Sequence, residues 1–202
     1  MVSLQQQFQK SKSRNIAFIA IFGTIWGIIE VSIGTYLHIF RFPFTGALMS
    51  SLSLLIILSG SVFIDEKLAI IKIGAVACFV RIFSVGSIII SPLISMAIEA
   101  IIANVIILIF SKNVFSFILT GITIVTYTFF HKFIAQGILF GKGIFKMYID
   151  VLNEGSKILG IDIHYAFLII FLLILLHIIL GIITGISAFY LANQAKKRLG
   201  YK

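Results

Sequence analysis

The chain has 202 residues, of which 60% are hydrophobic and only 11% are charged, and its mean hydropathy is +1.15. A soluble domain is about 25% charged and has too little interior to hide so much apolar surface, so this composition excludes an ordinary soluble protein. The net charge of +9 then concerns orientation in a membrane rather than nucleic acid, and the single cysteine, Cys78, excludes an internal disulfide.

The predicted elements begin with a polar, basic N-terminus over residues 1–14, in which we see no cleaved signal peptide. A membrane span needs about 20 mostly apolar residues. Six stretches meet this requirement, at residues 15–38, 44–64, 68–90, 93–111, 114–138 and 165–192. Residues 139–164 mix charged and apolar side chains, which predicts an amphipathic segment at the interface, and residues 193–202 form a basic tail. The expected fold is therefore an all-α, polytopic bundle of six helices in one membrane domain, residues 15–192.

The distribution of Lys and Arg predicts which side of the membrane each connection occupies. Basic residues concentrate at both termini and in the connections at Lys67 and Lys112, while the basic residues of the predicted outer loops, apart from Arg41, are offset by acidic ones. Because basic loops stay in the cytoplasm, we expect both termini inside and a multi-pass protein of the cell membrane.

Ionisable residues inside a span are costly and mark candidate sites. Four of them, on four different predicted helices, fall roughly 9–14 Å from the outer end of their spans, taking 1.5 Å per residue: Glu30, Arg81, Glu99 and His131. This common level predicts a polar pocket in the outer half of the bundle.

Two less specific readings stay open for these residues. Glu30, Arg81 and Glu99 would equally suit a buried ion-pair network that only fixes the packing of the helices. His131 and Lys132 would be ordinary interfacial residues if the fifth span ended near residue 130.

Small residues follow one face of the first and of the last predicted helix. In the first, Ala20, Gly23 and Gly27 recur at steps of three and four residues, and in the last, Gly181 and Gly185 form a GxxxG pattern. Such stripes let helices approach closely, either within the chain or against a partner subunit.

No motif of a soluble-type enzyme occurs in the chain. There is no P-loop, no HExxH, no GxSxG and no pair of intramembrane aspartates. An enzyme is therefore the weaker interpretation, and we expect neither a cofactor nor a metal ion.

The segments Ala17-Phe-Ile-Ala20-Ile-Phe-Gly23-Thr24 and Phe42-Pro43-Phe-Thr-Gly46, together with the size and six spans, carry a resemblance. The chain is similar in these features to the substrate-binding (S) subunits of energy-coupling factor transporters, which import vitamins and related nutrients. This resemblance covers the whole chain as architecture. In these transporters the coupling subunit usually docks at a pair of alanines in the first helix. Here the candidate pairs are Ala20 with Thr24 and Gly23 with Gly27, and neither is that usual pair.

The resemblance implies that a small organic nutrient enters from outside and binds among Glu30, Arg81, Glu99 and His131, with Tyr36 and His38 near the first outer loop stacking on it. It also implies docking of a membrane coupling subunit, driven by ATPases, on a face of the first helix marked by Ala20, Gly23, Thr24 and Gly27.

Two other classes of function remain as alternatives. A small secondary transporter would use Glu30 or Glu99 to carry a coupling proton. In a polytopic enzyme or a scaffold of a larger complex, these residues would have a role other than transport.

Overall fold

The computed structural model describes residues 2–40, 44–83, 90–140 and 163–200, with residues 143 and 146 besides. All the regular secondary structure of this part of the chain is helical, and this part contains no strand. Its elements, in chain order, are α1 (Val2–Ile29), η1 (Glu30–Gly34), α2 (Thr35–Ile39), α3 (Thr45–Ser61), α4 (Ala69–Ile82), α5 (Ile90–Phe110), α6 (Val114–Phe140) and α8 (Ile163–Arg198). The predicted all-α class is confirmed.

Four stretches in the described ranges are long and apolar enough to cross a membrane. They are Gln9–Leu37, Ile90–Phe110, Val114–His131 and Ile170–Arg198. α3 has 17 residues and α4 has 14, which at 1.5 Å each gives about 26 and 21 Å, against a hydrocarbon core of about 30 Å. The chain is thus a membrane protein, while two of the six predicted spans are shorter than expected.

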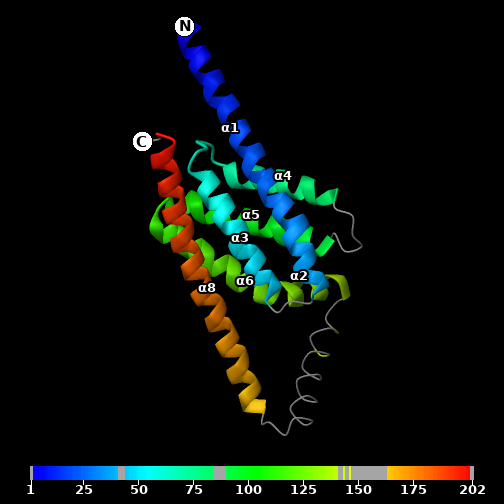
Figure 1. Ribbon diagram of the computed structural model, residues 1–202. Coiled ribbons are helices and arrows are strands. Elements are labelled where there is room, and N and C mark those ends of the chain that lie inside the picture. Colours follow the sequence, from blue (N-terminus) through cyan, green and yellow to red (C-terminus); the bar gives the residue numbers. More distant parts are fainter. Residues whose placement is uncertain are drawn as a thin grey trace.

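α1, α3 and α8 run lengthwise between the two ends of the bundle, whereas α4 lies across them (Figure 1). Both termini lie at one end, and α1 extends well beyond the other helices there (Figure 1). At this end, which we call the terminal end, Lys112 Nζ donates to the carbonyl of Ile64 at 2.8 Å, and Asn15 Nδ2 donates to Glu66 Oε1 at 3.3 Å. The connections after α3 and α5 therefore meet beside the start of the membrane part of α1, as the predicted topology requires.

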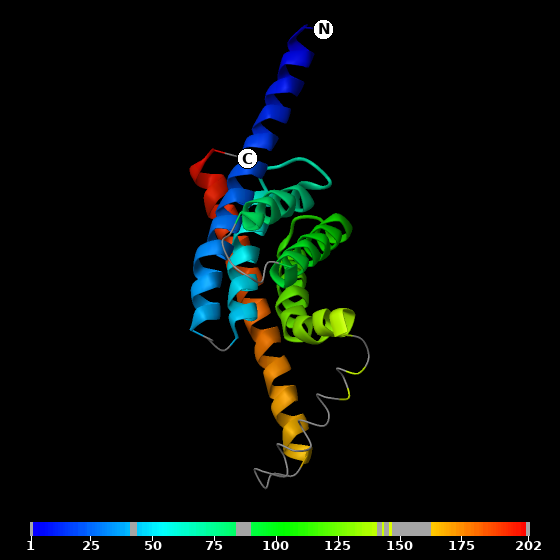
Figure 2. The same cartoon turned by 90° about the vertical axis from the view of Figure 1, so that its right-hand side faces the viewer.

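α3 is the central helix, because it contacts α1, α4, α6 and α8. Figure 2 shows α1 on one side of it and α5 and α6 on the other. Three of its apolar side chains, Leu54, Ile57 and Leu58, are fully buried. Residues 1–14, expected as a polar tail, are helical from Val2 and continuous with the first span, whereas most of the predicted amphipathic segment 139–164 lies outside the described residues.

Glycine pairs set the closest helix contacts. A Cβ on Gly181 of α8 would lie 2.6 Å from the carbonyl oxygen of Gly121 in α6, and one on Gly185 would lie 2.5 Å from the carbonyl oxygen of Phe117. The GxxxG pattern of the last helix therefore packs within the chain, where it brings the backbones of α6 and α8 together.

Candidate functional site

A buried carboxyl group lies near the middle of α5. Glu99 is only 3% exposed. Three serine hydroxyls contact it: Ser50 and Ser53 of α3 at 2.7 and 3.1 Å, and Ser95, one turn earlier on α5, at 3.0 Å. Burying an unsatisfied carboxyl in an apolar bundle is costly, so these hydroxyls are what make its position tolerable.

The hydrogen bonds continue from α5 to α6. Tyr127 interacts with Ser95 through its side chain, and its hydroxyl lies 2.7 Å from His131 Nδ1. The other ring nitrogen, Nε2, lies 3.2 Å from the hydroxyl of Ser91. A connected row of polar groups thus runs from α3 through α5 to α6. We call this row the Glu99 network; its members are Ser50, Ser53, Ser91, Ser95, Glu99, Tyr127 and His131.

Helical periodicity explains why these residues meet. Ser91, Ser95 and Glu99 follow one another at steps of four along α5, so they share a face. Tyr127 and His131 are likewise four residues apart on α6. Each helix therefore presents a narrow polar stripe in an otherwise apolar surface, and the stripes face each other.

Glu30 and Arg81 form the side of the site that comes from α1 and α4. Both are buried, and Arg81 Nη1 donates to the backbone carbonyl of Glu30 at 2.5 Å. Glu30 begins η1, a π-helical turn, which is a wider form often found at functional sites. Its carboxyl lies near enough to both Glu99 and Arg81 to interact electrostatically with them.

The predicted ion pair of Arg81 with Glu30 or Glu99 is not formed in the described part of the chain, where the ion pair recorded is Lys72 with Glu66. Arg81 instead bonds a carbonyl, and its buried Nε has no hydrogen-bond partner. The guanidinium therefore keeps an unused donor inside the bundle, a group that a bound anion would satisfy.

Of the six residues predicted to bind substrate, four come together in the described structure: Glu30, Arg81, Glu99 and His131. Tyr36 is 65% exposed and has no contact with them in the described structure, and the side chain of His38 lies outside the described part. Sequence reasoning missed the four polar partners Ser50, Ser53, Ser95 and Tyr127. Their spacing of four from Glu99 and His131 was the available signal on α5 and α6.

The predicted docking face on α1 is divided by the structure. A Cβ on Gly23 or Gly27 would lie 2.6 Å from the Cβ of Val76 or Val80, so these two glycines pack against α4 and do not form a free surface. Ala20 is exposed and Thr24 is half-buried. Of the predicted docking residues, only these two remain open to a partner.

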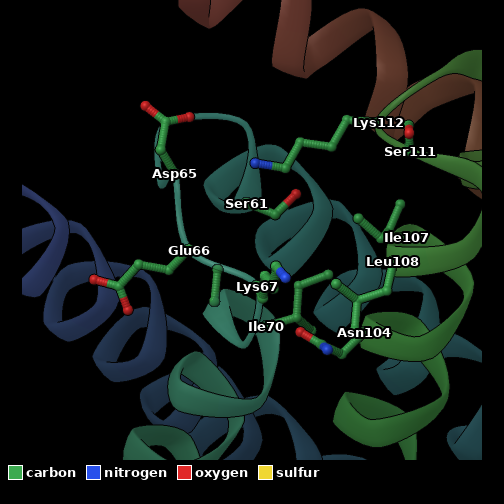
Figure 3. A pocket seen from close by; sticks show the side chains of 11 residues that line it. Ser61, Asp65, Glu66, Lys67, Ile70, Asn104, Ile107, Leu108, Ser111 and Lys112 are labelled. Carbon is green, nitrogen blue, oxygen red and sulfur yellow. The ribbon is translucent and has the colours of Figure 1, made fainter.

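A pocket of about 380 Å³ lies at the terminal end of the bundle, and the pocket in the outer half stays a prediction. It is lined by the connections after α3 and α5 and by the last turns of α5 (Figure 3). The hydrogen bond from Lys72 lowers the pKa of Glu66 there, and burial lowers the pKa of Lys112.

Within the ranges that the structure describes, no group of three His, Cys, Asp or Glu side chains is arranged to hold a metal ion. Comparison of the chain with protein-family models, with curated proteins and with solved structures gives no match.

Proposed function

We propose that the protein takes up a small organic solute across the cell membrane and recognises it at the Glu99 network together with Glu30 and Arg81. The observation that carries this proposal is the buried carboxyl of Glu99, held by serines of two helices inside an apolar bundle. Convergent polar groups in apolar surroundings are the usual composition of a small-molecule site.

The supply of hydrogen-bonding groups suits a solute with both acidic and polar parts. The free Nε of Arg81 is a donor for a carboxylate or a phosphate, which guanidinium groups bind through charge-assisted bonds. The carboxyl of Glu30 is an acceptor for an amine or amide group of the solute. We infer a vitamin-like nutrient with at least one anionic group.

The coupling that we propose is that of the S subunit of an energy-coupling factor importer, with six spans and both termini inside. A membrane coupling subunit would dock on the outward face of α1 at Ala20 and Thr24. Exposed isoleucines border this face, namely Ile16, Ile21 and Ile28. ATPases bound to that subunit would supply the energy, since this chain has no P-loop.

Binding to purified protein tests the recognition site. We expect native mass spectrometry to detect a co-purified solute, and calorimetry with that solute to show at least a tenfold loss of affinity in Arg81→Ala and in Ser50→Ala. Ser51→Ala is the matched control, because the Ser51 hydroxyl bonds the carbonyl of Ala47 in its own helix and not Glu99. Equal affinity in all four proteins would exclude the proposed site.

A second candidate function, proton-coupled secondary transport, is favoured by one detail of the network. Ser53 Oγ lies 2.9 Å from the carbonyl of Ser50 and 3.1 Å from Glu99 Oε2, and its single proton serves one acceptor at a time. When it serves the carbonyl, Glu99 must supply the proton of the second bond. A carboxyl placed to hold a proton is the carrier that such a transporter needs.

Uptake by cells separates these two candidates. In an importer driven by ATPases, Glu99→Gln should keep both binding and uptake, because the amide reproduces a protonated carboxyl at this position. In a proton-coupled transporter the same variant should bind the solute but fail to accumulate it, and a protonophore should abolish uptake by the native protein.

A further inference from the structure

The pocket at the terminal end has a different chemistry from the Glu99 network. In Figure 3 the ammonium groups of Lys67 and Lys112 lie over the hollow, whereas the carboxylates of Asp65 and Glu66 point away from it. Glu66 is already engaged, since it accepts hydrogen bonds from Lys72 and Asn15. The charged groups nearest the hollow are therefore the two ammonium groups, while Asp65 interacts electrostatically with Lys112 from the rim (Figure 3).

A buried donor without a partner faces the same pocket. Asn104 of α5 lines it and is 3% exposed, and its Nδ2 makes no hydrogen bond. Lys112 Nζ makes one bond, to the carbonyl of Ile64, which leaves two of its three N–H groups for a ligand. Two ammonium groups and an amide suit a singly or doubly charged oxyanion.

An apolar track leads from the pocket along the outside of α5. Leu108 lines the pocket and is 48% exposed. Val105 and Ile101, three and seven residues earlier on the same face, are 46% and 50% exposed. Because these residues belong to a helix that spans the membrane, a chain that follows the track from the pocket enters the hydrocarbon region.

We propose that this pocket binds the phosphate of an anionic phospholipid, with an acyl chain lying along Leu108, Val105 and Ile101. A free phosphate ion would satisfy the cationic groups but would leave the track without a role. Other basic residues at the same end, including Lys10, Lys12 and Arg14 at the start of α1 and Lys196, Lys197 and Arg198 at the end of α8, would hold that end at an anionic leaflet.

Native mass spectrometry of the detergent-solubilised protein tests the pocket, with phosphatidylglycerol and phosphatidylcholine of identical acyl chains as probes. We expect the native protein to retain phosphatidylglycerol at least tenfold more strongly than phosphatidylcholine. The double variant Lys67→Gln, Lys112→Gln should lose this preference. Lys67→Gln alone, which leaves the bond from Lys112 to Ile64 intact, should lose part of it in a protein whose melting temperature is unchanged.

The control is Lys10→Gln with Lys197→Gln, which removes the same charge from exposed positions at the same end and should bind phosphatidylglycerol within twofold of the native protein. Equal loss in this control would reduce the effect to general electrostatics and overturn the proposal. Retention of inorganic phosphate but not of phosphatidylglycerol by the native protein would do the same, because it would identify the ligand as a free anion. Unchanged lipid preference in the pocket variants would also exclude the site.

Discussion

Glu99 is the residue on which both candidate functions depend, and its neighbours specify which replacements it tolerates. Glu99→Gln keeps an oxygen for Ser50 and Ser95 and offers an N–H to Ser53, so we expect a change in the free energy of unfolding below about 1 kcal/mol. Glu99→Leu removes the acceptor of the buried Ser50 hydroxyl, while Ser53 keeps the carbonyl of Ser50 and Ser95 keeps Tyr127; a loss of roughly 1–3 kcal/mol should follow. Denaturation in mild detergent measures both; similar values for the two variants would argue against the network.

Arg81 provides a second test at this scale, because the structure replaces the predicted carboxylate partner by a backbone carbonyl. Glu30→Gln keeps that carbonyl and should leave the bond from Arg81 intact. Arg81→Leu should therefore destabilise the protein in both the native and the Glu30→Gln background, with a coupling limited to the charge interaction between the two side chains. The double-mutant cycle measures this directly, and rescue of Arg81→Leu by Glu30→Gln would restore the ion-pair interpretation.

At the scale of the elements, the crossing of α6 and α8 is the contact most sensitive to size. A methyl group on Gly181 would meet the carbonyl of Gly121 at 2.6 Å, which is backbone that cannot move aside. Gly181→Ala should thus cost about 1–3 kcal/mol of stability by overpacking. At Gly46 the nearest atom to a methyl group is Thr128 Cβ, 3.4 Å away, so Gly46→Ala is the control that should melt within a few degrees of the native protein.

The sequence predicted the helices, and helical rise along them gave Glu30, Arg81, Glu99 and His131 one common level, whose depth in a membrane stays a prediction. These four residues were placed together on that basis. The sequence did not predict the partners of Glu99, because the hydroxyl of a serine in a span more often donates to a carbonyl of its own helix, as that of Ser51 does to Ala47. The role of Gly23 and Gly27 also needed the structure, because a stripe of small residues does not say which helix it faces.

The lengths of α3 and α4 were mispredicted for a related reason. Apolar composition continues from Ala69 to Ile90, and composition alone cannot show that α4 ends at Ile82. Both helices pack against α1 and each other, so neighbouring helices rather than lipid cover much of their surface. A short helix is tolerated in such a position, where its ends meet protein.

For the whole molecule, the position of the two ends relative to the membrane is the remaining prediction. The terminal end gathers both termini and the connections that contain Lys67 and Lys112, and its excess of basic residues predicts that it faces the cytoplasm. Single cysteines would be introduced after Cys78 is replaced by alanine. Those at Ser13 and Ser111, both exposed, should react with a membrane-impermeant maleimide only after the cells are permeabilised.

Cysteines at Phe40 and Tyr165, which are 76% and 59% exposed and lie at the opposite ends of their helical segments from the terminal end, should react in intact cells. Comparison of Phe40 with Ser111 distinguishes two models of how α3 and α4 lie in the membrane. If α3 and α4 both traverse the membrane, all four positions react as stated. If either is instead a re-entrant or interfacial segment, Phe40 and Ser111 would react on the same side, and the six-span topology with both termini inside would be wrong.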